Sequence, residues 1–216
     1  MTTVRDPYDE ARRLIQPDFP KSKFHVFVLG PALKPEEEAA KPTIPPVDHE
    51  SILVHARYLR FLTKKELASS GYPVDFGEAE EIKEFWLKQF QATDLGSVEL
   101  LHASKFCGAI IVYPSSVGSI SELGMFTPYE VIAEKTLAVV HKPFENDSSF
   151  FRKALLEVFV QEKGRREFID YAQHEFCVNV AVEFVNGKYQ KLLRDLMSIK
   201  VGKEREGKYR GTRFQK

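Results

Sequence analysis

The sequence has little cysteine, since only Cys107 and Cys177 occur in 216 residues. Neither stands at a metal-binding spacing, and two cysteines so far apart provide no disulfide framework. Each lies within an apolar run, which predicts a small buried thiol in a reducing compartment. We therefore expect neither a disulfide nor a metal centre.

Long apolar runs and an excess of one charge are also missing. No stretch of about eighteen apolar residues occurs, so we expect a cytoplasmic protein with no membrane span and no secretory signal. The 31 basic residues balance the 31 acidic ones, which argues against attraction of the whole surface to nucleic acid or to a membrane. A GxGxxG or Walker loop is absent as well, so we expect no cofactor and no phosphoryl transfer.

The sequence does contain an uninterrupted strand, loop, helix and strand over residues 107–140. Residues 107–113 form a continuous apolar, β-branched run, typical of a parallel strand buried on both faces, and residues 136–140 repeat that character. Two such strands on either side of one helix predict a right-handed βαβ crossover.

The flanking pattern predicts further elements of the same kind. We expect strands at 24–29, 74–76 and 176–182, and helices at 5–16, 49–65, 81–91, 95–106, 148–163 and 183–200. The Pro- and Glu-rich segment 34–47 has little apolar content and predicts a mobile surface loop, a candidate lid. The element order predicts an α/β fold with a doubly wound, mostly parallel, five-stranded, Rossmann-like sheet.

The length fits one domain at residues 24–200, with a helical extension at 1–23 and a basic flexible tail at 201–216. In this tail basic residues outnumber acidic ones and apolar periodicity is lost, so we expect disorder in the free protein. Either the tail only aids solubility, or it binds a nucleic-acid partner through phosphate contacts, with Tyr209 and Phe214 stacking on bases.

The loop after strand 107–113 is the best candidate site. Pro114 ends the strand, Gly118 permits close approach of a ligand to the backbone, and Ser119 or Ser121 can cap the helix. Open α/β sheets bind ligands at such loops, and helix N-termini favour anionic or polar oxygens. Glu122 is predicted in the first helical turn, where it either points back over the loop or complements the helix dipole.

A resemblance to known proteins adds a function. The string GSISELG, from Gly118 to Gly124, resembles the Gly-Ser/Thr-x-x-Glu-x-Gly element of nucleoside 2-deoxyribosyltransferase-like proteins, in which the glutamate is the catalytic carboxylate. The arrangement over residues 24–143 resembles the N-glycosidase-type effectors of bacterial retron anti-phage systems. The resemblance implies a toxin that cleaves the base–ribose bond of a nucleotide or of a nicotinamide dinucleotide (NAD), an oligomeric state, and a reverse transcriptase and its msDNA as partners.

Cleavage of an N-glycosidic bond passes through an oxocarbenium-like state, which a carboxylate beneath the ribose stabilises. Glu122 is the candidate for that role, and Glu78 or Glu80, after the neighbouring strand, is the candidate to hold or protonate the leaving base. The residues expected to bind the nucleotide are Gly30, Arg57, Ser115, Ser116, Gly118, Ser119 and His141.

Plainer interpretations stay open for several of these residues. Gly30 could be a turn glycine, His141 a packing residue, and the acidic side chains partners of a helix dipole. Residues 114–117 read PSSV where deoxyribosyltransferases usually carry an aspartate, which argues against sugar transfer between bases. The alternatives to an enzyme are a nucleotide-sensing module, in which Glu122 grips ribose hydroxyls without cutting, and a partner-binding subunit.

Overall fold

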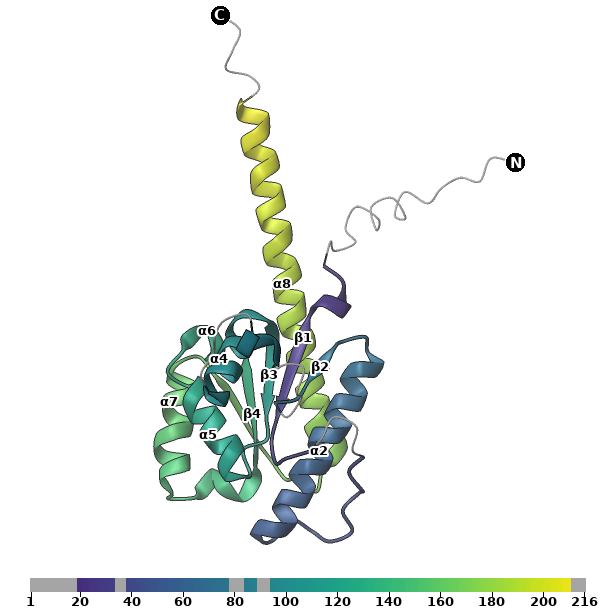
Figure 1. Ribbon diagram of the computed structural model, residues 1–216, viewed down its shortest axis with the longest axis vertical. Coiled ribbons are helices and arrows are strands. Elements are labelled where there is room, and N and C mark those ends of the chain that lie inside the picture. The colour runs from purple at the N-terminus through teal and green to yellow at the C-terminus, as the bar shows by residue number, and fades with distance from the viewer. Residues whose placement is uncertain (1–18, 34–37, 78–83, 89–93, 211–216) are drawn as a thin grey trace, which may run out of the picture.

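The computed structural model describes residues 19–33, 38–77, 84–88 and 94–210, with side chains as far as residue 198. Within them, five strands form one parallel sheet in the order β2-β1-β3-β4-β5 (Figure 1). The strands are β1 (His25–Leu29), β2 (Val74–Asp75), β3 (Cys107–Val112), β4 (Thr136–His141) and β5 (Arg165–Ile169). The predicted doubly wound α/β fold is confirmed.

Helices cover both faces of this sheet. They are α2 (His49–Ser69), α4 (Leu95–Lys105), α5 (Val117–Phe126), α6 (Glu130–Ala133), α7 (Leu156–Gln161) and α8 (His174–Arg210), with short 3₁₀ segments η1 (Lys21–Lys23) and η2 (Lys142–Asn146) and the π-helix η3 (Phe151–Leu155). α2 and α8 lie on one face, and the helices from α4 to α7 lie on the other (Figure 1). The predicted helix at 5–16 and parts of the helix at 81–91 fall outside the described residues.

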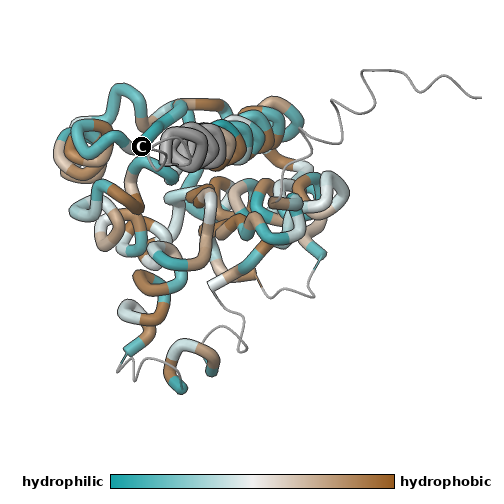
Figure 2. The backbone as a smooth tube through the Cα atoms, turned by 90° about the horizontal axis from the view of Figure 1, so that it is seen from above, coloured by the Kyte–Doolittle hydropathy of each residue, from teal (hydrophilic) through white to brown (hydrophobic). Residues whose placement is uncertain are grey.

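The side chains of each central strand alternate between these two faces. In β1, Val26 and Val28 join the core under α2 and α8, whereas Phe27 and Leu29 join the core under the other helices. Burial on both faces explains why the central strands read as continuous apolar runs. The outer helices alternate between hydrophobic and hydrophilic colours along their length, as elements that bury one side do (Figure 2).

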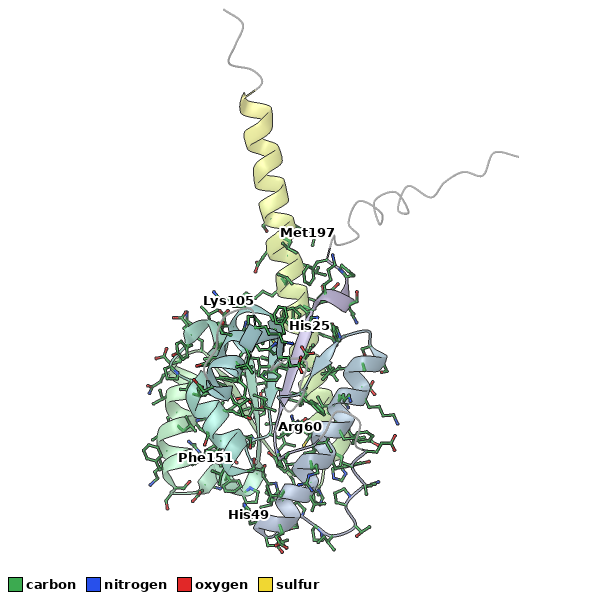
Figure 3. The ribbon with its side chains drawn as sticks, in the orientation of Figure 1. His25, His49, Arg60, Lys105, Phe151 and Met197 are labelled. Atoms are coloured by element: carbon green, nitrogen blue, oxygen red, sulfur yellow. The ribbon has the colours of Figure 1, made fainter. Side chains whose placement is uncertain are left out.

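The strand order places a switch point between β1 and β3. The chain leaves β1 toward β2 on one side of the sheet and leaves β3 toward β4 on the other. Connections that diverge in this way open a crevice at the carboxyl ends of the two strands, where ligands bind in this fold. His25 at the amino edge and His49 at the carboxyl edge lie at opposite ends of the domain (Figure 3).

One predicted strand is wrong. Residues 176–182 belong to α8, and the fifth strand is β5 at Arg165–Ile169. Cys177, Val178 and Ala181 are all buried at helical spacing, so the β-branched run there serves a helix. Among the described residues β5 pairs only with β4, and it is largely half-exposed, so it lacks the apolar run of a central strand.

The C-terminal segment also differs from its prediction. α8 continues as one helix of 37 residues to Arg210, roughly 55 Å long, and extends well beyond the sheet (Figure 1). Leu193 is its last buried side chain among those described. The predicted disorder is therefore wrong for residues 201–210, while 211–216 lie outside the description. In the described part of the chain, no helix has the length and apolar character needed to span a membrane.

Candidate functional site

The switch point is held together by the ends of β1 and β3. The Tyr113 N–H donates to the Leu29 carbonyl at 2.9 Å, which extends the pairing of the two strands to the start of their loops. Gly30, directly after β1, is buried, and a Cβ atom on it would lie 3.3 Å from Arg60 Cδ and 3.4 Å from Tyr113 Cβ. Close packing against these side chains explains the glycine without a ligand.

The loop after β3 is organised by a capping box. Ser116 is the N-cap of α5: its hydroxyl lies 3.2 Å from the Ser119 N–H, and the Ser119 hydroxyl accepts from the Ser116 N–H at 3.0 Å. The Ser115 N–H donates to the same Ser119 oxygen at 3.1 Å. Three of the donors that the sequence assigned to a ligand are thus used inside the loop, and the N–H groups of Val117 and Gly118 lie outside this box.

Gly118 occupies the second position of α5 and borders open space. A Cβ atom added there would have only the Ser116 hydroxyl oxygen within 4 Å, at 3.9 Å. Its backbone is helical, so a turn does not explain the glycine. The space above the helix start is therefore available to a ligand.

Because Ser116 is the cap, Glu122 is the sixth residue of α5 and stands in its second turn. The predicted first-turn position is wrong, and the helix dipole acts mainly within the first turn. Helical side chains lean toward the N-terminus, so Glu122 projects over the turn that contains Gly118 and Ser119. Its Oε2 atom is buried although the residue as a whole is only half-buried.

The other predicted charged residues lie in different surroundings. Arg57 is exposed on α2, and its Nε donates to the Ala32 carbonyl at 2.9 Å, just after β1. Glu78 and Glu80 fall outside the described residues. A Cβ atom added to Gly77, just before this segment, would lie 3.6 Å from Leu29 Cδ2, so the segment begins beside the end of β1.

His141 is a packing residue at the end of β4. It is 2% exposed, its Nδ1 accepts the Tyr171 N–H at 3.1 Å, and its Nε2 donates to the Pro46 carbonyl at 3.0 Å. Because Nδ1 faces a donor, the proton of the neutral ring sits on Nε2. Burial lowers the pKa of His141, although Asp170 at 3.9 Å opposes this effect. Both ring nitrogens are thus already occupied.

Tyr171 connects this region to the Ser115 loop. Its hydroxyl donates to the Val139 carbonyl at 2.7 Å and accepts from the Ser115 hydroxyl at 3.2 Å. Burial raises the pKa of Tyr171 well above its usual value, so the phenol stays protonated. The Ser115 hydroxyl therefore binds the buried Tyr171 hydroxyl and does not point to solvent.

Sequence reasoning missed Arg60, which is 1% exposed at the base of the switch point (Figure 3). Its guanidinium donates to the carbonyls of Val28 at 3.0 Å, Gly30 at 3.4 Å and Pro31 at 3.0 Å, and it lies 4.3 Å from the Phe76 ring. Arg60 lies four residues after Ala56 on the inward stripe of α2, and a charge on that stripe was the available signal.

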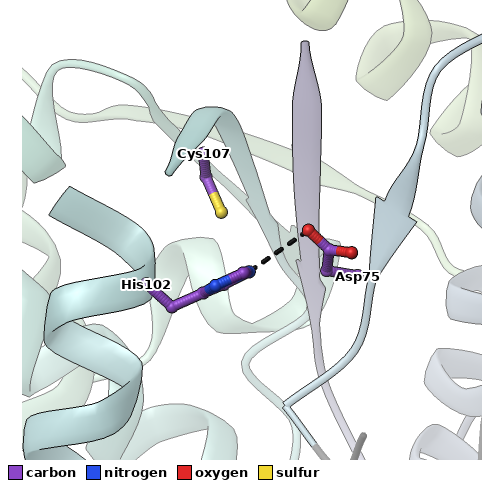
Figure 4. Close-up of side chains that lie close together, drawn as sticks. All are labelled: Asp75, His102 and Cys107. Carbon is purple, nitrogen blue, oxygen red and sulfur yellow. Dashed lines mark hydrogen bonds and ion pairs between the residues drawn. The ribbon is translucent and has the colours of Figure 1, made fainter. Parts of the chain in front are cut away.

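A second cluster lies away from this site and brings together Asp75, His102 and Cys107, whose ligand atoms are all within 4.8 Å of one another (Figure 4). His102 Nε2 lies 3.2 Å from Asp75, and His25 Nδ1 lies 2.9 Å from the same oxygen. Burial raises the pKa of Asp75, but the hydrogen bonds from the two histidines outweigh it and lower that pKa.

The Trp86 indole shows whether this cluster is a metal site or a hydrogen-bonded network. Its N–H donates to His102 Nδ1 at 3.1 Å, so the ring proton sits on Nε2 and points at Asp75. A metal-bound histidine instead donates its second N–H outward. Burial also raises the pKa of Cys107 well above its usual value. The arrangement is that of a buried hydrogen-bonded network, which sequence spacing did not reveal.

Comparison with protein families gives one match. The sequence model described as "STM3845 retron effector protein" matches residues 56–209, more than half of the chain. The match covers most of α2, the Ser115–Glu122 segment and α8, and it begins after β1. Among curated proteins, none matches the chain.

Proposed function

Because the chain belongs to the STM3845 retron effector family, we propose that it serves anti-phage defence by cleaving the N-glycosidic bond of a nucleotide. The observation that supports this most is the position of Glu122 in the second turn of α5, one helical turn after Gly118, with its Oε2 atom buried. A carboxylate in the second turn is poorly placed to stabilise the helix dipole. It is well placed to meet a ligand bound at the switch point.

Cleavage of the N-glycosidic bond is favoured by a negative charge near the ribose C1′ atom. When the bond between ribose C1′ and the base nitrogen breaks, the base leaves with the electron pair and the sugar becomes oxocarbenium-like. A carboxylate fixed near C1′ stabilises this cation more than it stabilises the neutral ground state. In our proposal Glu122 supplies that charge, and the oxygen of a water molecule then bonds to C1′ and loses a proton.

The α5 terminus would hold the other end of the substrate. The N–H groups of Val117 and Gly118 lie outside the capping box and belong to the first turn, where the helix dipole favours anionic oxygens. Gly118 leaves room for a phosphate or ribose to approach. The leaving base needs a proton or a hydrogen-bond donor, and Glu78 or Glu80 remains our proposal for it.

A direct assay tests this function. The purified protein is incubated with NAD and with the common ribonucleotides and deoxyribonucleotides, and free bases are separated by chromatography. We expect one substrate to lose its base in the wild type and to stay intact with Glu122→Gln. Recovery of every nucleotide unaltered would contradict the proposed hydrolysis, and retention of one intact nucleotide would favour a sensing module instead.

A further inference from the structure

Residues 38–48, which we call the strap, run beside α2 and reach the carboxyl edge of the sheet (Figure 1). Two buried histidines from different elements hold this strap. His55 of α2 has its Nε2 2.7 Å from the Ile44 carbonyl, and His141 of β4 has its Nε2 3.0 Å from the Pro46 carbonyl. Both partners are backbone oxygens, so Nε2 of each ring carries a proton in these contacts. The Nδ1 atom of His55 lies 3.2 Å from the Tyr171 carbonyl and 2.9 Å from His174 Nε2.

Little else fixes the strap to the domain. Ile44 is 59% exposed and Val47 is 79% exposed, so its largest apolar side chains do not enter the core. Pro46 is buried and Ala39 packs on the core, and Pro42 is half-buried. A segment held by few apolar contacts opens at lower free energy than the sheet beneath it.

The strap has a firm hinge and free space beside it. At its C-terminal end the N–H groups of Val47 and Asp48 both donate to the Ser51 hydroxyl, at 3.1 and 3.0 Å, which ties that end to the start of α2. On the side that faces α2 and α8, a cavity of about 660 Å³ lies between Lys41 and the side chains of Tyr58 and His174. The strap is thus not packed on that side.

The contact between His141 and the strap is connected by hydrogen bonds to the loop of the candidate site. His141 binds the strap through Nε2 and the Tyr171 N–H through Nδ1, and the Tyr171 hydroxyl accepts from Ser115. Ser115 in turn donates to Ser119 in the capping box of α5. One set of hydrogen bonds therefore runs from the strap to the helix start.

We propose that the strap is a hinged cover of the carboxyl edge, latched by the Nε2–H groups of His55 and His141, which opens to admit the ligand. The ligand part of this inference rests on the proposed function, and the latch itself does not. The prolines at 42, 45 and 46 keep the strap stiff, so it opens as one piece about the Ser51 hinge.

A matched pair of substitutions separates the latch from general stability. In His141→Asn the side-chain oxygen takes the place of Nδ1 and keeps the Tyr171 N–H paired, but the shorter side chain cannot reach Pro46. In His141→Gln the amide nitrogen takes the place of Nε2 and keeps the donor to Pro46, while the Tyr171 N–H loses its acceptor.

Hydrogen exchange measured by mass spectrometry on the full chain reads the outcome. We expect the amides of Thr43 and Ile44 to exchange about fivefold faster in His141→Asn, the effect of losing one hydrogen bond, and to be unchanged in His141→Gln. Peptides of β3 and β4 should be unchanged in the Asn variant. Equal strap exchange in the wild type and the Asn variant, or equal acceleration in both variants, would overturn the latch.

Adding NAD as the probe tests whether the strap covers a ligand. If the strap covers the ligand, saturating NAD should slow hydrogen exchange of the strap in the wild type. In a separate measurement, NAD should associate faster with His141→Asn than with His141→Gln. Association at equal rates in the two variants would overturn the gating role. A protein that neither binds nor cleaves NAD would exclude NAD as the ligand that the strap covers, while the exchange data without NAD still decide whether the histidines hold the strap.

Discussion

Ser116 and Ser119 hold the start of α5 between them, each hydroxyl accepting the other residue's N–H. Because this pairing fixes where the helix begins, it also fixes Glu122 in the second turn. The side chain of Glu122 then leans toward the N-terminus and over Gly118, which has no side chain. The capping box is thus what gives the carboxylate its place at the switch point.

Glu122→Gln should abolish base release while leaving the fold intact. The amide keeps the size of the side chain and its hydrogen bonding, but it cannot neutralise a developing cation. We expect a loss of at least about a hundredfold in turnover, measured by chromatography of the released base. If expression of the wild type is toxic to cells, the same change should relieve that toxicity.

Glu130→Gln is the matched control for this change, since Glu130 is an exposed glutamate of α6 paired with Lys163. It alters charge by the same amount away from the site and should retain wild-type turnover. Comparable turnover in wild type and Glu122→Gln would rule out the catalytic role of Glu122.

Gly118→Ala should weaken nucleotide binding without lowering the melting temperature. The new methyl group meets no protein atom closer than 3.9 Å, so it fills only the space that a ligand would use. Gly124→Ala, near the other end of the same helix, makes ordinary contact with Leu155 at 3.9 Å and serves as the control. Calorimetry showing equal affinity in the two variants would mean that no ligand approaches Gly118.

Much of the fold could be predicted because the central strands bury both faces. The apolar runs at 107–112 and 136–140 identify β3 and β4. The one helix expected between them corresponds to α5, and the short helix α6 that follows it was not predicted. β5 could not be predicted, because an edge strand that pairs on one side needs no such run. The run 176–182 satisfied the strand pattern, and only packing against the sheet shows that it is helical.

The site was less accessible to prediction. The sequence located the loop after β3, but it offered Ser119 or Ser121 as the cap. The cap is Ser116, and its role depends on hydrogen bonds that periodicity does not report. The partners of His141 come from residues far along the chain, Pro46 and Tyr171, so its role could not be read locally. Arg60 was missed because a buried arginine is defined by the carbonyls around it.

Arg60→Lys should lower the free energy of unfolding by roughly 2–4 kcal/mol, because a buried ammonium cannot reach the carbonyls that the guanidinium joins. Arg57→Lys, three residues earlier on α2, removes one hydrogen bond at an exposed position and should cost roughly 0.5 kcal/mol. Urea denaturation measures both. Similar midpoints for the two variants would mean that Arg60 does not anchor the loop after β1.

Acid should break the contact between His141 and Tyr171. Burial lowers the pKa of His141 below its ordinary value of about 6.5, so the folded state favours the neutral ring. The proton that the ring gains goes on Nδ1, which faces the Tyr171 N–H, while the Nε2–H keeps its contact with the Pro46 carbonyl. The stabilisation by the neutral ring is present above that ordinary pKa and is lost as the pH falls through the lowered one. The Pro46 carbonyl and Asp170, at 3.9 Å, limit the shift, while His55 on α2 adds to it.

Exchange at the Tyr171 amide, corrected for the intrinsic chemical rate, should therefore rise in the wild type as the pH falls below about 6.5. His141→Gln has no titrating group at this position, so exchange at its Tyr171 amide should stay level over that range. A wild-type profile as flat as that of the Gln variant would exclude His141 as the acid-sensitive group.

The C-terminal part of α8 leads to the last prediction, which concerns the partner. Deletion of residues 202–216 removes six basic and two acidic residues and begins well after Leu193, the last buried position of this helix among the described side chains. The truncated protein should keep its melting temperature and its base-release activity. If the segment binds the phosphates of a nucleic-acid partner such as msDNA, the plot of log affinity against log salt should become shallower by roughly two to four.

Single-stranded DNA serves as the probe, with affinity measured at several salt concentrations. Tyr209→Leu with Phe214→Leu keeps every charge, so it should lower affinity by the loss of stacking while leaving the slope unchanged. This separates the two contributions, because charge alone sets the slope. If full-length and truncated proteins bind with the same slope, the segment has no electrostatic role and the nucleic-acid surface must lie on the folded domain.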